Sequence, residues 1–515
     1  MFGHQMDVGG PLPGSLPTGA TPIFGEGLSI PPVKIFREGV LSQDVLDVIL
    51  NNVRMPEMNR ADLLGIIAGC RTGEKRVHEL CERFGKDTYL AACQALLDRT
   101  YNAMAKLILA AIPEEPQSFE DWIDDDGLGH GPYKMKLTIW REGEHAYFDW
   151  SGTDPQAMGP VNFYLSEAMF KMFIGVYLIM VFDPQILFND GFYPLLHVVI
   201  PDGSLLHPKF PSALGSRTHA LTRLFDVLGG ALARKSPEHT TAAGYGTSPY
   251  MLYSGWDGRG TFFYLMEISY GGLPGRPIGD GPDGHSWWPL FQNIPTEYLE
   301  AYYPVRIDGY TTLTDSGGAG FHRGGNGIEK RYVYLEPGEV SIHDDRWLTY
   351  PWGIIGGKPG SRSEKILRRV DGTEELLPSK CDEVQVRPGD VLVYRTAGGG
   401  GWKDPLDRPV ERVEADVAKG LVSREKAERD YGVVVGDAEA TEKLRARMRE
   451  ERGELLDFDF GPPLDEIRAR AREETGHEPP LPPEPLPWAP MESAEDALQR
   501  VRDVGDRQMT LSEAR

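Results

Sequence analysis

The chain has 515 residues, too many for a single core, so we expect roughly two to four domains. A hydrophobic fraction of 40% with 10% aromatic residues predicts a globular protein. The net charge of −23 argues against nucleic acid and anionic membranes as partners, because both bind basic surfaces. The longest apolar run, Met172–Phe182, is too short for a membrane span of about 20 residues. Four cysteines without a C-x-x-C pair fit a reducing, cytoplasmic location.

The first part of the chain divides into an irregular and a helical stretch. Glycine and proline crowd residues 1–42, which predicts a loop segment. From 43 to 115, apolar residues recur at spacings of three and four, which predicts a helical subdomain. Its stripes are Leu63, Ile66, Ile67 and Cys70, then Val77, Leu80, Cys81 and Phe84. We expect Cys70 and Cys81 to pack there as small hydrophobes.

Residues 116–245 predict a mixed α/β part. Lys134–Trp140 and His145–Trp150 flank a turn and predict a hairpin with one half-buried face. A buried helix at about 166–182 and a strand at Leu195–Ile200 follow. Thr218–Lys235 has the spacing of an amphipathic helix that ends before a proline.

Short strands separated by glycine-rich turns predict a β-rich domain of sandwich or barrel type over 246–405. Residues 406–515 are charged and helical in pattern, with Ser423 placed to cap a helix. Within this tail, Pro479–Pro490 predicts a semi-rigid linker or a strap on a surface. The predicted fold class is therefore α+β and multi-domain: a helical N-terminal subdomain, a β-rich central domain and peripheral C-terminal helices.

Several common catalytic motifs are absent. Gly356-Gly357-Lys358 is followed by Pro359, so no phosphate-binding loop with a magnesium-binding hydroxyl is present. No dinucleotide fingerprint follows a strand, and the chain has no G-x-S-x-G nucleophile elbow. If the reaction uses ATP, we expect another polypeptide to bind it.

His4 and Asp7 are spaced so that imidazole and carboxylate can close on one divalent metal, and two glycines follow them. By itself this H-x-x-D pattern is more often a loop histidine beside a turn-forming aspartate. Glu26 lies between two glycines that let its carboxylate turn inward toward a metal or substrate. Its alternative is a solvated turn residue.

Three further clusters are unusually dense. In Pro211–His219, Arg217 lies near a helix start, where an anion can bind; a capped helix with a surface arginine explains it equally well. Six glycines in Asp315–Gly327 indicate close backbone approach, positive φ or both around Asp315 and Arg323, which either brace the loop or contact substrate. Four consecutive glycines in Thr396–Pro405 predict an anion-binding nest or a flexible hinge.

Taken in order, these segments resemble the hydantoinase B/oxoprolinase family across about residues 1–435. The matching segments are His4–Gly10, Glu26–Pro32, Asn52–Pro56, Pro201–Leu206, Pro211–Arg217, Asp315–Gly327, Gly398–Pro405 and Asp430–Val433. The resemblance implies a two-subunit, ATP-dependent enzyme, in which a hydantoinase A-type partner binds ATP and phosphorylates an amide, lactam or enolate oxygen. The B-type subunit then completes the reaction, by hydrolysis or by carboxylation.

By this resemblance His4 and Asp7 match the metal-binding motif of the family, with Glu26 as a further ligand or base, and the metal is Zn, Mn or Fe. We take Asp7 and Glu26 as candidate catalytic residues and Arg217, Asp315 and Arg323 as candidate substrate-binding residues. Family members also have a segment before the motif that helps to complete the metal site. We therefore expect either a separate N-terminal fragment as a second partner, a misplaced start or a degenerate subunit.

The leading functional prediction is a B-type subunit of an ATP-dependent hydrolase that opens a small cyclic amide such as a hydantoin or 5-oxoproline. The first alternative is a subunit of a biotin-independent, ATP-dependent ketone carboxylase. The second is a non-catalytic subunit that docks onto a complete homologue.

Overall fold

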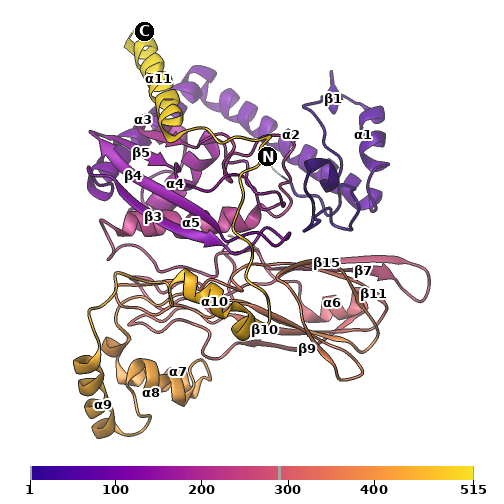
Figure 1. The fold of residues 1–515 in the computed structure, drawn as a ribbon. Helices are drawn as coiled ribbons and strands as arrows, with labels where there is room; N and C mark the ends of the chain where they lie inside the picture. Colours follow the sequence, from indigo (N-terminus) through magenta and orange to yellow (C-terminus); the bar gives the residue numbers. More distant parts are fainter. Residues whose placement is uncertain (1–2, 288–290, 514–515) are drawn as a thin grey trace.

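The computed structural model describes residues 3–287 and 291–513, with the side chains of 504–513 excepted. It has the predicted mixed α+β class, with helices toward the N-terminus and several β-sheets. Figure 1 shows two stacked parts: a helical and sheet part from the first half of the chain, and a β-rich part below it that carries the C-terminal helices α7–α9 at its far end.

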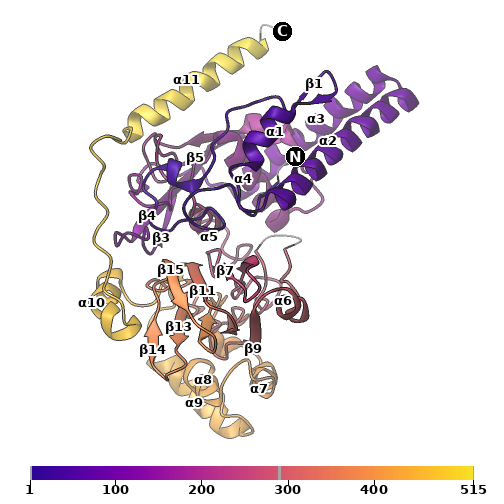
Figure 2. The same cartoon turned by 90° about the vertical axis from the view of Figure 1, so that its right-hand side faces the viewer.

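The chain begins as an irregular segment that contains the short helix η1 (Ile23–Glu26) and a small ribbon of β1 (Phe36–Arg37) and β2 (Val40–Leu41). Three helices follow: α1 (Gln43–Leu50), α2 (Pro56–Phe84) and α3 (Lys86–Ala111). Helices α2 and α3 form a long antiparallel hairpin whose outer end extends away from the body, as Figure 2 shows.

The predicted helical stripes form as helices, but the structure does not bury them. Asn59 is the one buried residue of α2. Cys70 is exposed and Cys81 is half-buried, so the expectation that both pack as core hydrophobes is wrong for Cys70. Leu63, Ile66, Ile67 and Cys81 are half-buried, and none of residues 60–99, which form the outer hairpin of α2 and α3, is fully buried.

A four-stranded sheet forms the core of the first half. Its order is β3-β4-β5-β6, with the first three strands antiparallel and β5 parallel to β6. The strands are β3 (Gln117–Ile123), β4 (Tyr133–Glu142), β5 (His145–Asp149) and β6 (Leu196–Val199), so the predicted hairpin and strand are confirmed. Side chains along β4 alternate between buried and half-buried, as a sheet with one covered face requires.

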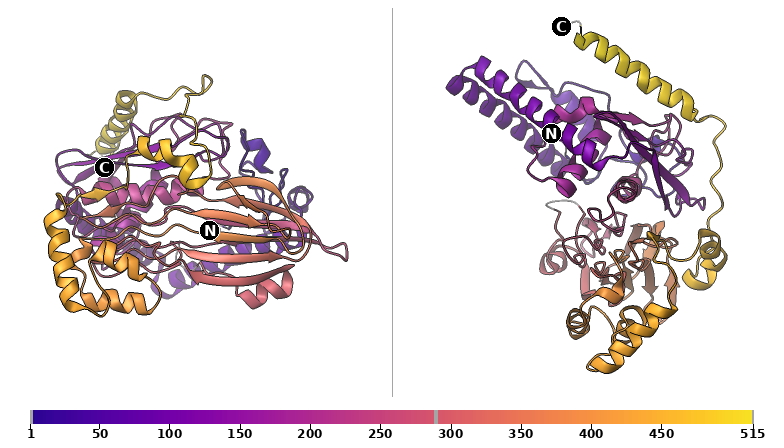
Figure 3. Two further views of the ribbon diagram at one scale, coloured as in Figure 1. Left: turned by 60° about the horizontal axis from the view of Figure 1, so that its bottom comes forward. Right: turned by 90° about the vertical axis from the view of Figure 1, so that its left-hand side faces the viewer.

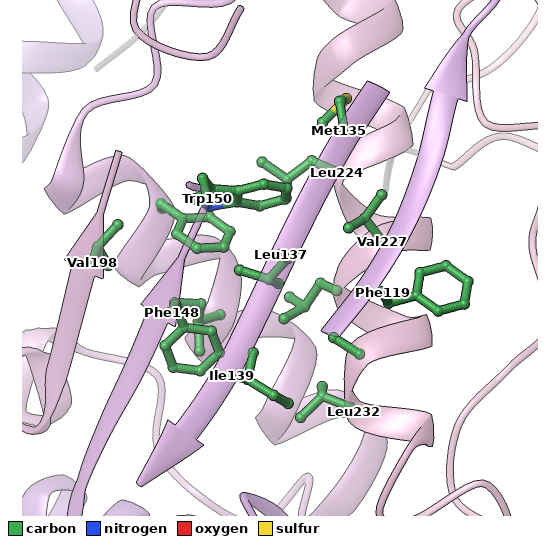
Figure 4. Packing of buried hydrophobic residues seen from close by; sticks show 14 of the residues in the cluster. Phe119, Met135, Leu137, Ile139, Phe148, Trp150, Val198, Leu224, Val227 and Leu232 are labelled. Atoms are coloured by element: carbon green, nitrogen blue, oxygen red, sulfur yellow. The ribbon is translucent and has the colours of Figure 1, made fainter. Parts of the chain in front are cut away.

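Two helices pack on this sheet. Helix α4 (Glu167–Phe182) is capped by the Ser166 hydroxyl, which accepts a hydrogen bond from the Met169 amide, and the short helix η2 (Asp190–Leu195) follows it. Helix α5 (Thr218–Ala233) presents an apolar side to the strands, and Figure 4 shows Leu224, Val227 and Leu232 among the strand side chains.

The β-rich part is a sandwich of two antiparallel sheets, which selects the sandwich over the barrel. One sheet has the order β14-β13-β16-β10-β9 and the other β15-β11-β7-β8. The strands are β7 (Tyr250–Trp256), β8 (Phe262–Ile268), β9 (Val305–Thr312), β10 (Ile328–Tyr334), β11 (Gly338–His343), β13 (Glu364–Arg368), β14 (Glu374–Leu376), β15 (Lys380–Val386) and β16 (Val391–Arg395). Residues of both sheets share one apolar cluster, which lies between them. Helix α6 (Thr296–Tyr302) lies against β9.

The glycine-rich segments pack against one another as extended chains. The amides of Gly399, Gly400 and Gly401 donate to the carbonyls of Gly325, Ala243 and Lys358 at 2.8–2.9 Å, so successive N–H groups bond to three different segments. A Cβ added at Gly399 would lie 2.2 Å from the Leu273 carbonyl oxygen. Both predictions for this run, an exposed anion nest and a flexible hinge, are therefore wrong, because the N–H groups are bonded internally and the run is buried.

The C-terminal tail runs over both parts of the molecule. Its helices are η3 (Pro405–Asp407), α7 (Val410–Ala418), α8 (Arg424–Tyr431), α9 (Ala438–Glu451), α10 (Leu464–Thr475) and α11 (Ala494–Glu513), and β17 (Phe458–Asp459) pairs with β12 (Gly353–Ile354). Ser423 caps α8 as predicted. Between α10 and α11 the chain forms the strap that the prolines predict, and Figure 3 shows it crossing from the β-rich part to the first half. Leu481 exchanges backbone hydrogen bonds with Gly129 and Gly131 on that path. Among the described residues, no helix is long and apolar enough to cross a membrane.

A layer of buried charges joins the two halves. Arg223 on α5 donates to Asp345 at 2.8 Å, and Arg346 donates to Asp121 at 2.7 Å and Asp226 at 3.3 Å. All five side chains are at most 1% exposed. Burial raises the pKa of the Asp226 carboxyl to about 7, against the opposing charge of Arg346. This layer fixes α5, and with it the loop before α5, relative to the sandwich.

Candidate active site

Asp7 is the centre of the first loop. Its side chain is 1% exposed and accepts hydrogen bonds from the amides of Gly9 and Gly14, both at 3.1 Å. It also accepts from Arg54, from the backbone amide at 3.0 Å and from Nη1 at 2.8 Å. Both carboxylate oxygens are thus used to fold the loop and to attach it to the start of α2. Position 9 requires glycine for two reasons. Its φ is +91°, and a Cβ there would lie 2.6 Å from the Asn52 carbonyl oxygen.

The proposed metal ligands are not gathered into one site. His4 is exposed, whereas Asp7 is buried and bonded to Arg54. Within the described ranges, no group of three or more His, Cys, Asp or Glu side chains is placed to hold a metal ion. The donors present do not fit a complete divalent-metal site by themselves. A metal-binding role for His4, Asp7 and Glu26 therefore stays a prediction.

Glu26 lies against the loop that precedes α5. Its Oε1 accepts hydrogen bonds from the amides of Leu214 at 2.6 Å and Gly215 at 2.5 Å. A Cβ at Gly215 would lie 3.1 Å from that oxygen, so glycine permits the approach. Burial raises the pKa of Glu26, while these two amides and the charge of Arg217 oppose the rise. The two amides of the loop predicted to hold an anion are thus bonded to a carboxyl group of this chain, and anion binding with Arg217 stays a prediction.

The structure brings two separately predicted clusters together. Ile23 donates its amide to the Pro211 carbonyl at 2.8 Å, and the ring of Phe24 packs edge-on against Phe210. This pairing places Glu26 beside the loop that carries Arg217 at the start of α5. Arg217 is half-buried, and its charge acts on Glu26 and on Tyr250 of the sandwich. The arrangement provides a carboxyl with a raised pKa next to a guanidinium.

Sequence reasoning missed the sandwich residues that complete this junction. The Ser216 hydroxyl lies 3.3 Å from Nδ1 of His343, which ends β11. Burial and the charge of Lys380 lower the pKa of His343 to about 3, so this imidazole is neutral. Asp382 of β15 accepts from the Thr18 amide at 2.6 Å and ties the first segment to the same sheet edge. The polar run His343-Asp344-Asp345-Arg346 at the end of an alternating strand was the signal that could have indicated this region.

Asp315 and Arg323 have other partners. Asp315 accepts from the Ser423 amide at 2.7 Å and so braces the start of α8. Arg323 forms two hydrogen bonds to Asp283, at 2.6 and 3.0 Å, and lies 3.7 Å from Asp416 of α7. These contacts connect the glycine-rich segments to the C-terminal helices, which supports the bracing interpretation. A substrate-binding role for the two residues stays a prediction without support from their contacts.

An apolar groove lies next to the Glu26 segment in the sequence. It has a volume of about 350 Å³ and is formed by the stretch after Gly27 and by one side of α1. Its lining residues include Leu28, Ile30, Val33, Val45 and Val48. A volume of this size fits a small ring compound.

Comparison with known proteins assigns the chain to a family. Residues 1–405 match the family model of hydantoinase B/oxoprolinase. The chain belongs to the hydantoinase B/oxoprolinase family. This confirms the resemblance found from the separate motifs.

Two curated relatives match most of the chain. The B-type subunit of a putative D-/L-hydantoinase from Pseudomonas sp. strain NS671 is 29% identical over 458 residues, which cover 85% of this chain and 75% of that protein. The beta subunit of the caprolactamase of Pseudomonas jessenii is 30% identical over 454 residues, covering 84% of this chain and 76% of its own. Both relatives are named as one subunit of an enzyme.

Solved structures agree with this assignment. The crystal structure of ATP-dependent caprolactamase from Pseudomonas jessenii superposes with a TM-score of 0.77 at 29% identity, over 86% of this chain and 79% of that chain. An acetone carboxylase structure has a TM-score of 0.76 at 20% identity, over 92% and 70% of the two chains, which shows a shared fold alone.

Proposed function

We propose that this chain is the B-type subunit of an ATP-dependent hydrolase that opens a small cyclic amide, working with a hydantoinase A-type partner. The observation that carries the proposal is the match to an ATP-dependent caprolactamase over most of both chains, at 29% identity and a TM-score of 0.77. A second relative is named as a hydantoinase subunit, and hydantoins are also cyclic amides.

The need for ATP follows from the chemistry of the bond. An unstrained amide is a poor electrophile, and a phosphoryl group on its oxygen makes that oxygen a good leaving group. In this chain the Gly356–Pro359 turn is closed, since Lys358 pairs with Asp459 at 3.2 Å and a Cβ at Gly357 would lie 2.1 Å from the Gly401 carbonyl oxygen. The glycine-rich runs are therefore structural, and we assign ATP binding to the A-type partner.

We assign proton transfer during ring opening to Glu26. Both of its amide hydrogen bonds end on Oε1, so Oε2 is the oxygen placed to exchange a proton with substrate. A carboxyl whose pKa is raised by burial is suited to general acid–base catalysis near neutral pH. Arg217 supplies a positive charge beside it for an anionic group, such as the phosphoryl group on the activated amide.

Reconstitution tests the proposal. The chain is co-expressed with its A-type partner, and ADP release and ring-opened product are measured with hydantoin, 5-oxoproline and caprolactam. We expect at least one ring to be opened at a rate that needs ATP and both subunits. Acetone with bicarbonate is run in parallel, and carboxylated product in place of ring opening would overturn the hydrolase assignment.

A matched pair of variants tests the role of Glu26. Glu26→Gln keeps the shape and the Oε1 hydrogen bonds but removes the titrating proton, so we expect kcat to fall by roughly 10²–10⁴-fold with little change in KM. Glu57→Gln at the exposed start of α2 serves as the control and should leave both constants unchanged. Equal activity of Glu26→Gln and wild type would remove Glu26 from the mechanism.

A further inference from the structure

The strap, defined as residues 476–493 between α10 and α11, connects the two halves of the molecule. It contains seven prolines between positions 479 and 490, and proline-rich chains of this kind are extended and semi-rigid. Figure 2 shows it running along one side of the protein from the β-rich part to the first half. The strap lies outside residues 1–405, which match the family model, so that match assigns it no role.

The strap is attached to the sandwich at its start and to the first half along its way. Ile467 of α10, the helix that precedes the strap, shares an apolar cluster with Trp347. Leu481 then donates its amide to the Gly129 carbonyl and accepts from the Gly131 amide, both at 2.7 Å. These bonds fix the middle of the strap across the seam between the two halves.

The far end of the strap lies against the segment that leads to the loop before α5. Lys209 of this segment donates from Nζ to the Pro490 carbonyl at 2.6 Å. The Glu492 amide donates to the Asp202 carbonyl at 2.8 Å, and the Asp202 amide donates to the Glu492 carboxylate at 3.1 Å. Ala489 is 2% exposed, so a buried apolar contact adds to these hydrogen bonds.

Lys209 also belongs to a tight turn that the strap contact holds from outside. Its carbonyl accepts hydrogen bonds from the amide of Ser212 at 3.1 Å and from the hydroxyl of the same residue at 2.8 Å. Gln156 braces the turn from the other side, because its side chain accepts from the Lys209 amide at 2.7 Å and donates to the Ser212 hydroxyl at 2.6 Å. The turn therefore moves as one unit.

The turn continues directly into the loop that binds Glu26. Ser212 forms a β-bridge with Pro22, the residue before the short helix that ends at Glu26. The amides of Leu214 and Gly215, two and three residues after Ser212, donate to Oε1 of Glu26. A displacement of the turn would therefore displace both hydrogen bonds that hold this carboxyl group.

We propose that the strap is a clasp that sets the position of the loop before α5, with Lys209 as the positioning residue through which it holds Glu26. Lys209 acts through the turn and the two loop amides. Because both amide bonds end on Oε1, a fixed loop also fixes where Oε2 lies, as a preorganised site requires. The consequence for catalysis rests on the proposed function, whereas the position of the loop does not.

Hydrogen exchange in the full chain tests whether the strap holds the loop. Exchange is measured in peptides that cover residues 210–217 for the wild type, Lys209→Met and Lys209→Arg. Methionine keeps an apolar stem but removes the donor to Pro490, so we expect the Leu214 and Gly215 amides to exchange roughly tenfold faster. Arginine restores a donor and should return exchange to near the wild-type rate. Exchange at the wild-type rate in Lys209→Met overturns the proposal.

A matched pair of strap variants separates a clasp from a general loss of stability. Ala489→Glu places a charge at a buried contact and should lift the far end of the strap, whereas Trp488→Glu adds the same charge at a neighbouring position that is 49% exposed. We expect faster exchange over residues 210–217 in Ala489→Glu alone, with exchange in the middle of α5 unchanged in both variants. Unchanged exchange over 210–217 in Ala489→Glu, or faster exchange throughout α5, overturns the proposal.

Activity of the complex with the A-type partner gives a separate result. We expect Lys209→Met to lower kcat by roughly three- to tenfold at unchanged KM, and Lys209→Arg to restore it. Faster exchange combined with wild-type kcat would support the clasp and count against the proposed role of Glu26. The failure of the clasp and the failure of the proposed function are thus read from different measurements.

Discussion

Helix α5 and the outer hairpin have the same apolar spacing and opposite surroundings. Helix α5 buries thirteen of its sixteen residues, with an apolar side on the sheet and a polar side in the layer of buried charges. The outer hairpin buries none of its forty. Apolar spacing therefore identifies which side chains share a face, but it does not reveal what covers that face or the opposite one.

We expect the largest difference in stability loss between the replacement of a buried arginine and that of an exposed one. Arg223→Met on α5 removes the 2.8 Å partner of Asp345 in a dry layer and leaves it only Lys380 at 3.0 Å as a cationic partner, so we expect a loss of about 3 kcal/mol in the free energy of unfolding. Arg76→Met on α2 removes an equally close pair with Glu79 that is 72% exposed at the arginine, and should cost less than about 0.5 kcal/mol. Urea unfolding measures both; similar losses would show that burial does not separate the two helices.

Truncation of a leucine gives the next effect. Leu224→Ala opens a cavity between α5 and the sheet and should cost about 2–5 kcal/mol. Leu80→Ala removes a side chain that is 42% exposed, and the loss in free energy of unfolding should stay below about 1 kcal/mol. The two variants are compared by urea unfolding, and a large loss of stability for Leu80→Ala would show that other residues cover the outer hairpin.

Replacement of a glycine by alanine should change the stability in opposite directions in α5 and α2. A Cβ at Gly230 of α5 would lie 2.4 Å from the Phe119 ring, so Gly230→Ala should destabilise by about 1–3 kcal/mol. At Gly65 of α2 a Cβ meets nothing within 4 Å, so Gly65→Ala should stabilise by about 0.5–1 kcal/mol through helix propensity. Thermal unfolding of both variants checks this, and the same sign for both would break the contrast.

The smallest expected effect is on the pH dependence of the free energy of unfolding. Burial lowers the pKa of His219 on α5 well below its usual 6.5, so the folded state keeps this imidazole neutral. Below about pH 6.5 the unfolded state binds the extra proton, and stability falls by up to about 1.4 kcal/mol per pH unit for each such group. Stability from a neutral His219 is thus present above about pH 6.5 and lost on acidification.

Replacement of His219 isolates its contribution to the pH dependence of stability. His219→Gln should make the fall in unfolding free energy between about pH 6.5 and pH 5 shallower by roughly one proton. The slope that is left comes from the other histidines whose pKa is lowered, His343 and His197 among them. His78→Gln on the exposed side of α2 should leave the slope as in the wild type. A slope unchanged by His219→Gln would mean that this histidine is protonated in the folded protein.

Local features of the fold were predictable from the sequence. The β4–β5 hairpin, α4 and the cap at Ser423 depend on alternation, helical spacing and one hydroxyl, all of which lie within about a dozen residues. The glycine-rich run at Gly399 was not, because its N–H groups bond to segments that are distant in the sequence. Close backbone approach was predicted for Asp315–Gly327, whereas the nest or hinge predicted for the Gly399 run was wrong because backbone of distant segments fills the space around it.

The candidate site shows the same limit. Glu26 and Arg217 were each identified by their glycine-flanked or helix-start position, yet the electrostatic interaction between them depends on pairing between residues 22–26 and 210–215. Asp315 was identified by the same kind of reasoning and braces α8 instead. Residue type and local flexibility identify groups that can take part in catalysis. Long-range pairing determines which of these groups lie close together.

The most direct test of the proposed function is the ratio of ADP to ring-opened product in single turnovers of the reconstituted complex. We predict one ADP for each cyclic amide opened, and no product when either this chain or ATP is left out. Ring opening without ATP, or product formed by the A-type partner in the absence of this chain, would contradict the proposal.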